Sequence, residues 1–447
     1  MNRIESVSST LFVLLLAVLI PFGVAEGTSI SSNKLLSSES FIFDVNAIQD
    51  IFEKYNDRNI SDLQSLGLFA LGFTVDLNKL ISWDGLCFHM NGITAYSRHL
   101  YNQEIELAEL SNIQSGNTIK LQELWLKQNI LEKGSLLLGV YDLNSEFDVN
   151  LLTGTFLNGY FGMGPDFSQS GKNGVPTFPD PALAFRIKIN LCDNIYLQTA
   201  ISDGVPGKTE YPSVHDIGIS EDEGALLCTE IGYRTGVKRM RSVHIRPGRF
   251  RQHGIIHDSK SRRHHHWRQK SQYLKKKSMP DNLICRQYEK AALGIWYYSV
   301  DFEPYNNNVV GDVKSWGGYI LGEKVLWGRS SQLLGGFARF GWANPRVNPI
   351  AVSWSCGIVL YSFSDQGNLH DLGLAIETSC FSKDYRQKMI ETDQQIDRQQ
   401  NVIEFYWGFQ INDTFMLQPD LQYIVNLHEG WSTENNLALG LRCAVSL

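Results

Sequence analysis

Charged side chains are scarce in this chain of 447 residues, since Asp, Glu, Lys and Arg together make up only 19% of it. The aromatic residues Phe, Trp and Tyr, by contrast, supply 11%. A disordered chain shows the opposite balance, with many charges and few aromatic side chains, so that class is excluded. The length admits about three domains of ordinary size or one large barrel.

The sequence also lacks the short motifs of common catalytic and metal sites. Its seven cysteines include no C-x-x-C pair, which excludes a zinc ribbon and a thioredoxin-like centre. There is no G-x-S-x-G, no H-E-x-x-H and no phosphate-loop pattern. We therefore expect no catalytic residues, no cofactor and no metal site.

Beyond residue 25, no stretch of 18 apolar residues occurs, so no membrane-spanning helix is expected there. At the start, Arg3 precedes the apolar run Leu11–Ile20, and small residues follow up to Ala25. This order is typical of a secretory signal peptide, and we expect residues 1–25 to be removed. The alternative is a membrane anchor, but the apolar stretch spans about 15 residues where a spanning helix needs about 20.

The formal net charge of -7 conceals a strong asymmetry. Residues 237–277 hold fourteen Lys or Arg against the single acid Asp258, together with six of the eleven histidines. A nucleic-acid binder would spread positive charge over a folded face, so no nucleic-acid partner is expected. The tract also lacks the carboxylates of a defined metal site. We expect residues 237–289 to form a solvated, disordered insertion.

Apolar and polar residues alternate with a period of two along most of the chain after residue 35. In the last segment, every second residue from Leu437 to Leu447 is apolar, and those between are small, polar or charged. Similar alternation covers 401–411 and 182–189. Strands of about ten residues with this pattern are typical of a membrane barrel in an exported protein. A soluble sandwich also alternates, but it turns its apolar face inward.

Sixteen such strands are predicted, and bacterial barrels require an even number. Short connections such as 191–194 alternate with long ones such as 143–181, as expected when both termini are periplasmic. We predict an all-β fold, a transmembrane antiparallel barrel over residues 40–447 that follows a periplasmic segment at 26–39. The predicted strands are 40–48, 66–75, 85–96, 119–129, 134–142, 182–189, 195–202, 223–234, 290–302, 317–328, 333–343, 350–363, 371–380, 401–411, 415–425 and 436–447.

The ordered series of segments carries a family resemblance. The stretch from Gly139 to Gly207, GVYDLNSEFDVNLLTGTFLNGYFGMGPDFSQSGKNGVPTFPDPALAFRIKINLCDNIYLQTAISDGVPG, resembles the core of the carbohydrate-selective porin family of the OprB type. Further matches are LGLFALGFTVDLNKLISWDG upstream, and GGFARFGWA and IEFYWGFQINDTFMLQPDLQYIVN downstream. The resemblance covers most of residues 40–447. The chain departs from the family in ending on Leu447, where such porins usually end on an aromatic residue.

Membership of this family would imply a channel of the bacterial outer membrane that passes carbohydrates by facilitated diffusion. Its partners would then be carbohydrate solutes, outer-membrane lipid and lipopolysaccharide, and the barrel-assembly machinery. Whether copies associate into a homo-oligomer stays open. The alternatives are a general non-selective porin and a structural or adhesive barrel with a plugged interior.

The long connection 143–181 has a composition that suits sugar passage. Sugars have apolar faces and hydroxyl rims, so their sites combine aromatic rings with amides and carboxylates. We predict that this loop folds into the lumen and narrows the pore. The alternative is an external loop packed on its neighbours. The candidate sugar-binding residues in the loop are Glu146, Asn158, Asp166 and Phe167.

If the apolar side of each strand faces lipid, the charged residues between must face the lumen. A Lys or Arg on the lipid face near the bilayer midplane costs about 2–4 kcal/mol, which favours this inward assignment. These side chains could select solutes, or they could only solvate a water-filled pore. The pore-lining candidates are Glu123, Trp125, Lys127, Arg186, Lys188, Glu230, Arg339, Glu404, Asp420 and Arg442, with Arg234 and Glu377 also expected to face inward.

Overall fold

The structure is a computed structural model, which describes most of the chain from residue 37 onward. The predicted signal peptide at 1–25, nearly all of segment 26–39, and the basic insertion 237–289 except its last two residues lie outside the described residues. The described ranges are 37–38, 41–56, 61–77, 81–99, 110–131, 133–207, 224–235, 288–306, 311, 313–329, 331–363, 369–394, 396–429 and 432–447.

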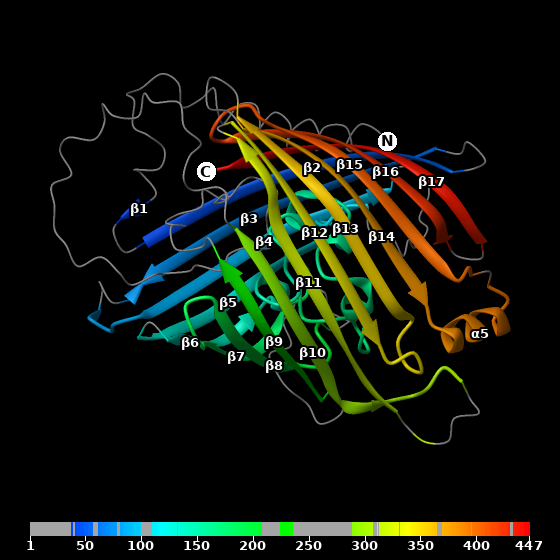
Figure 1. Ribbon diagram of the computed structural model, residues 1–447, viewed down its shortest axis with the longest axis horizontal. Helices are drawn as coiled ribbons and strands as arrows, with labels where there is room; N and C mark the ends of the chain where they lie inside the picture. The colour runs from blue at the N-terminus through cyan, green and yellow to red at the C-terminus, as the bar shows by residue number, and fades with distance from the viewer. Residues whose placement is uncertain are drawn as a thin grey trace, which may run out of the picture.

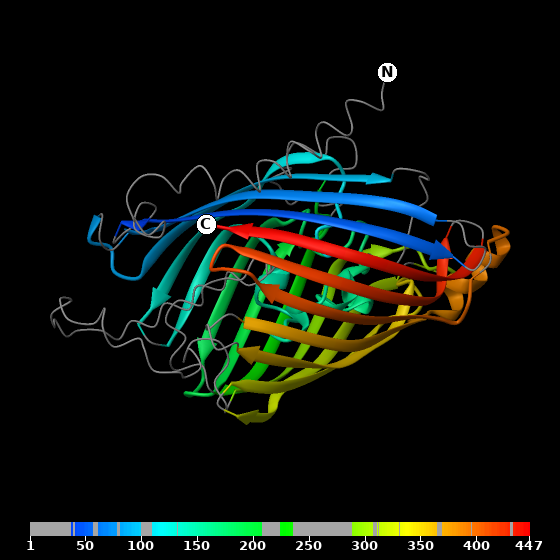
Figure 2. The ribbon, with the colours of Figure 1, turned by 90° about the horizontal axis from the view of Figure 1, so that it is seen from above.

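Within these ranges, sixteen long antiparallel strands form a closed wall (Figures 1 and 2), preceded by the two-residue strand β1 (Ser37–Ser38). The wall closes because β17 pairs with β2 and β9 pairs with β10. The strands are β2 (Phe41–Asn56), β3 (Ser61–Asp76), β4 (Leu86–His99), β5 (Thr118–Ile130), β6 (Gly134–Tyr141), β7 (Ala182–Asn190), β8 (Ile195–Asp203), β9 (Ala225–Thr235), β10 (Glu289–Phe302), β11 (Val313–Arg329), β12 (Gln332–Ala343), β13 (Ile350–Phe363), β14 (Leu369–Phe381), β15 (Gln399–Gln410), β16 (Phe415–Glu429) and β17 (Ser432–Ser446).

The period-two pattern places apolar side chains on the outside of this wall. In β17, Leu439 is 47% exposed and Leu441 41%, whereas Ala438 is fully buried and Arg442 is 1% exposed. Successive side chains of a strand point to opposite faces, so this split follows directly from the alternation. Most of the strands show it, and the outer face of the barrel is consequently apolar. The predicted orientation is confirmed.

Each predicted strand has its counterpart, several strands extend by a few residues beyond their predicted ends, and two differences are larger. The strand predicted at 40–48 continues to Asn56, because Asp50, Phe52 and Lys54 keep the inward parity and pair with β3 along its length. The connection predicted at 381–400 contains helix α5 (Lys383–Glu391). The Ser382 hydroxyl caps this helix by accepting from the backbone N–H of Tyr385 at 3.1 Å, an arrangement typical of helix starts.

Most connections at one end of the barrel are short, for example 191–194 and 411–414, with 236–288 as the exception, and several at the other end are long, for example 142–181 and 382–398. Short turns belong to the periplasmic side and long loops to the outside. The C-terminus therefore lies at the periplasmic end, and α5 lies at the outer end (Figure 1). Among the described residues, no helix is long and apolar enough to span a membrane.

Candidate functional site: the loop inside the barrel

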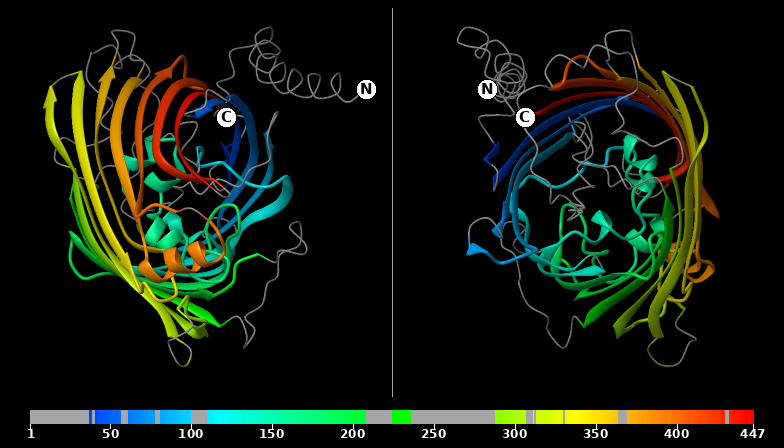
Figure 3. Two further views of the ribbon diagram at one scale, coloured as in Figure 1. Left: turned by 90° about the vertical axis from the view of Figure 1, so that its right-hand side faces the viewer. Right: turned by 60° about the vertical axis from the view of Figure 1, so that its left-hand side comes forward.

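The segment 142–181, which we call the inner loop, connects β6 to β7 and lies within the ring of strands (Figure 3). The inner loop is compact because polar side chains begin its turns. Asp142 accepts from the backbone N–H of Asn144 at 2.8 Å, and Asn158 accepts from that of Tyr160 at 3.0 Å. Its short helices are η1 (Leu143–Ser145), η2 (Thr153–Thr155), η3 (Gly159–Phe161) and α4 (Pro165–Ser168). The loop lies inside the barrel, as predicted.

Three glutamates of the wall, which come from β9, β11 and β15, hold the backbone of the inner loop. Each carboxylate accepts hydrogen bonds from loop N–H groups, and bonds of this charge-assisted kind are about twice as strong as neutral ones. The bonds are Glu230 with Asp148 N (3.2 Å), Glu323 with Leu151 N (2.8 Å) and Leu152 N (2.9 Å), and Glu404 with Leu157 N (2.6 Å) and Asn158 N (2.9 Å). The loop is thereby fixed at three sites along its course.

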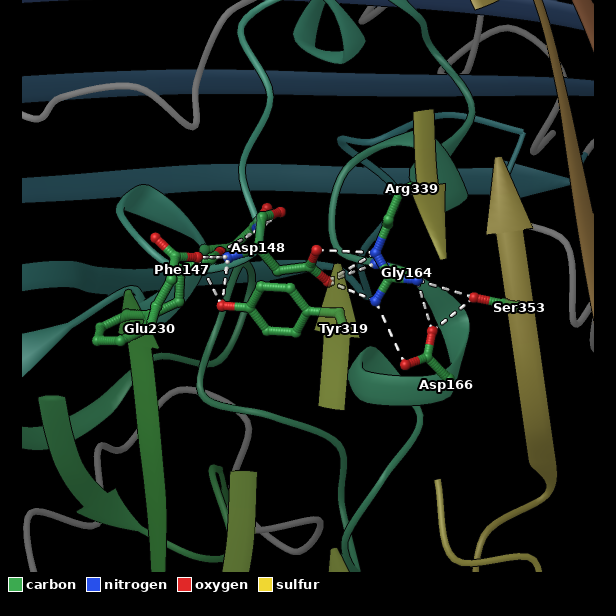
Figure 4. Close-up of polar contacts among 9 residues, drawn as sticks. Phe147, Asp148, Gly164, Asp166, Glu230, Tyr319, Arg339 and Ser353 are labelled. Atoms are coloured by element: carbon green, nitrogen blue, oxygen red, sulfur yellow. Dashed lines mark hydrogen bonds and ion pairs between the residues drawn. The ribbon is translucent and has the colours of Figure 1, made fainter. Parts of the chain in front are cut away.

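A fourth attachment is a buried ion cluster around Arg339 of β12 (Figure 4). The guanidinium lies 2.7 Å from Asp148 Oδ2 and 2.6 Å from Asp166 Oδ1, and none of the three side chains is more than 4% exposed. The Ser353 hydroxyl also donates to Asp166 at 2.5 Å. Gly164 allows this approach, since a Cβ there would lie 2.0 Å from the guanidinium carbon.

Aromatic rings of the inner loop pack on rings of the wall. Phe167 lies parallel to Trp296 of β10, with ring centroids 5.1 Å apart. Phe156 meets Tyr406 of β15 edge to face at 5.0 Å. Both phenylalanines are buried, so their rings anchor the loop and are not presented to the solvent.

Near the start of the inner loop, Glu146 faces two cations of β7. Its carboxylate lies 2.6 Å from Arg186 Nε and 3.4 Å from Lys188 Nζ, and it accepts from the Tyr141 hydroxyl at 2.8 Å. Burial alone would raise the pKa of Glu146, but the positive charges of Lys188 and Arg186 outweigh burial and hold this pKa well below its usual value. Glu146 is therefore a carboxylate at neutral pH.

A second segment, 110–117, also packs inside the barrel against the inner loop. The backbone N–H of Asn112 donates to the carbonyl of Leu157 at 2.6 Å. The Ser111 hydroxyl donates to Asp50 of β2 at 2.6 Å, and Asp50 is paired with Arg442 at 2.5 Å. Segment 110–117 therefore covers the inner face of the wall near β2 and β17.

All the sequence-predicted residues lie on the inner side of the wall or in the inner loop. The inner loop and segment 110–117 cover most of the wall charges, so these side chains are buried inside the barrel. Contact with sugar stays a prediction for the whole set. Glu146, Lys188 and Arg234 are half-buried, and the buried residues are Glu123, Trp125, Lys127, Asn158, Asp166, Phe167, Arg186, Glu230, Arg339, Glu377, Glu404, Asp420 and Arg442.

The structure brings several of the predicted residues together, and it adds three that the sequence reasoning missed. Asp166 joins Arg339, Glu146 joins Arg186 and Lys188, Asn158 joins Glu404, and Trp125 donates to Glu123 at 3.2 Å. The missed residues are Asp50, Asp148 and Glu323. Parity could have revealed Glu323, since it continues the inward series of the predicted strand 317–328.

A closed antiparallel barrel of sixteen strands, apolar outside and with a long loop packed inside, defines an outer-membrane porin. Residues 61–447 match the carbohydrate-selective porin family, the OprB family, and the chain belongs to this family. It is accordingly a carbohydrate porin of the bacterial outer membrane.

Individual relatives are distant in sequence. Porin B of Pseudomonas aeruginosa is 22% identical over 402 residues, which cover 84% of this chain and 80% of that protein. A high-pH structure of OprB from Pseudomonas putida matches with a TM-score of 0.72 at 16% identity, over 93% of this chain and 96% of that one. A low-pH structure of the same protein matches with a TM-score of 0.51 at 14% identity, over 92% and 93% of the two chains. These structural matches establish the shared fold.

Proposed function

We propose that the inner loop sets the aperture of a passive sugar channel and that the protein converts no substrate. Four wall residues, Glu230, Glu323, Arg339 and Glu404, fasten the loop across the bore. This fastening is the observation that carries the proposal. An aperture selects solutes reproducibly only when its edge is held to within a fraction of an ångström.

The half-buried polar side chains beside the loop are the best candidates for contact with passing solutes. Glu146 and Lys188 combine an acceptor and a donor at one edge of the inner loop. Such a pair offers hydrogen bonds to sugar hydroxyls, and it also creates a local field across the pore. Fully buried members of the predicted set act by positioning the loop.

Conductance in planar bilayers tests this function. A monosaccharide should lower the ion conductance of the native protein in a concentration-dependent way, because a sugar in the aperture displaces ions. Glu323→Gln removes the charged acceptor of two loop N–H groups and should raise conductance and weaken the block by sugar. Glu289→Gln is the matched control, since Glu289 is half-buried on the outer face beside Lys324 and should leave both unchanged.

The outcomes separate the candidate functions. Conductance that no mono- or disaccharide affects would reduce the protein to a general porin. The lack of any conductance would favour a structural or adhesive barrel. If the Glu323→Gln variant had the same conductance and the same block by sugar as the native protein, the loop would not set the aperture.

Two further partners belong to this proposal. The apolar outer face requires insertion into the outer membrane, which we expect the barrel-assembly machinery to carry out. Whether the barrel functions alone or as a homo-oligomer can be read from native mass spectrometry in detergent.

A further inference from the structure

Basic side chains gather on the inner face of the wall near its periplasmic end. Lys188 lies two residues before the end of β7, Arg234 lies one before the end of β9, and Lys290 lies one after the start of β10. These strand ends lie on the periplasmic side, together with the short connections 191–194 and 411–414. Together with Lys127 near the end of β5, these residues form what we call the basic half-ring.

Two members of the half-ring face each other directly. Arg234 and Lys290 are cross-strand partners in the pairing of β9 with β10. Side chains at such positions have Cβ atoms about 4.5–5.5 Å apart, and like charges there destabilise a sheet. Both side chains are half-buried, whereas most inward neighbours of the same strands are fully buried. They therefore border accessible space inside the bore.

Among the residues that the structure describes, the contacts of the two cations involve an aromatic ring and a carbonyl group but no acid. Arg234 lies over the Tyr196 ring at 5.3 Å from its centroid, and Lys290 donates to the carbonyl of Val149 in the inner loop. Lys188 approaches the same Tyr196 ring at 4.8 Å. Among the described residues, neither Arg234 nor Lys290 has a carboxylate partner in an ion pair.

The acids of this region are engaged elsewhere. Glu230 accepts from the hydroxyls of Tyr196 and Tyr319 and from the inner loop. Glu323 accepts from two loop N–H groups and from the Tyr288 hydroxyl at 2.6 Å. Glu146 is shared between two cations, Arg186 and Lys188. A solute anion at the half-ring would consequently meet Arg234 and Lys290, neither of which is paired with a described carboxylate.

We propose that the basic half-ring is a subsite for the anionic group of an acidic monosaccharide, a sugar that bears a carboxylate or a phosphate. Rings of Lys and Arg serve anion and phosphate pores in this way, and an Arg fork binds both groups well. The subsite lies near the periplasmic end, beside Glu146 and Val149 of the inner loop. The proposal deepens the sugar-channel function above and rests on it.

The test measures the half-blocking concentration of four solutes with the full-length mature barrel in planar bilayers: glucose, gluconate, glucose 6-phosphate and inorganic phosphate. For the native protein, both acidic sugars should block at lower concentration than glucose. The double variant Arg234→Gln, Lys290→Gln should raise the half-blocking concentration of the acidic sugars about tenfold, which corresponds to about 1.4 kcal/mol, because the anion loses its charged donors. Glucose should block this variant as it blocks native protein.

Lys324→Gln is the matched control, because Lys324 lies on the outer face of β11 near the same rim and is 63% exposed. This variant should leave the half-blocking concentrations of all four solutes unchanged. The single variant Arg234→Gln keeps the bond between Lys290 and the loop. If the double variant folds poorly, block by the acidic sugars and by glucose is compared in this single variant instead. The reversal potential in a KCl gradient gives a second readout, which should shift toward cations in both half-ring variants.

Three results would overturn the proposal. Unchanged block by the acidic sugars in the variants would show that the half-ring binds no anion. Weaker block by glucose and the acids alike would mean that the substitutions alter the aperture. If inorganic phosphate blocked at the same concentration as glucose 6-phosphate, the ligand of the half-ring would be a free anion and not an acidic sugar. Failure of glucose to affect native protein would contradict the sugar-channel function, whereas the anion comparison would still be readable.

Discussion

Arg442 shows how the environment of one inward residue depends on what covers it. Its side chain points into the barrel, as the alternation in β17 requires. There it pairs with Asp50, and both side chains are almost completely buried. Removal of one partner from a buried ion pair leaves the other charge unpaired, which typically costs about 3–5 kcal/mol.

We expect Arg442→Leu to lower the free energy of unfolding by about 3–5 kcal/mol, because Asp50 would keep its charge without its partner. The double variant Arg442→Leu, Asp50→Asn should recover part of this loss. Leu441→Arg places a charge against lipid and should cost up to about 2–4 kcal/mol near the midplane. Denaturant titration after refolding in detergent measures all three. An unchanged free energy of unfolding in the Arg442→Leu variant would show that Arg442 lies in water.

At the scale of elements, the inner loop and the wall are stabilised differently. The strands are held by continuous ladders, for example from Phe41 to Tyr55 of β2 against β3. The inner loop is held by side chains that reach it from the wall. Docking of the loop should therefore be separable from formation of the barrel.

Phe167→Ala should release α4 from the wall while the barrel stays folded. Phe167 is fully buried and stacks on Trp296, and truncation of such a ring typically costs about 3–5 kcal/mol. We expect higher conductance and faster proteolytic cleavage within 142–181. Lys172→Ala, at an exposed position of the same loop, is the control and should change neither. Loss of the heat-modifiable barrel band in gel electrophoresis would contradict the separation of loop and barrel.

At the scale of the whole molecule, closure of the barrel depends on every neighbouring pair of strands. The pairing between β9 and β10 involves ten residues of each strand, from Leu226 to Thr235 and from Glu289 to Tyr298. The segment between these strands contains the basic tract 237–277. The register of β9 and β10 is therefore set by their own hydrogen-bonded pairing.

Deletion of residues 240–284 should leave the barrel and its single-channel conductance nearly unchanged. The register of β9 and β10 is set by their own pairing, and a shorter connection carries little entropic cost. Heat-modifiable migration in gel electrophoresis, together with conductance, checks this. A deletion variant that no longer folds would show that the segment belongs to the barrel.

The sequence by itself determined the barrel. The period of two is the repeat of the strand, so residues such as Leu439 and Arg442 had to point to opposite faces once the segment formed a strand. Strand ends were less certain where polar residues interrupt the pattern. The strand predicted at 40–48 is an example, because the inward residues Asp50 and Lys54 interrupt the apolar alternation before the strand ends at Asn56.

Only the tertiary structure decided what the inward residues contact. Asp148 and Asp166 share Arg339, although about 190 and 170 residues separate them from it, and nothing in a local pattern encodes that distance. The same holds for Glu404 and the loop backbone at residues 157 and 158. Local periodicity fixes the face on which a side chain lies. Its partners depend on how a non-periodic loop folds across the bore, and that is set by long-range packing.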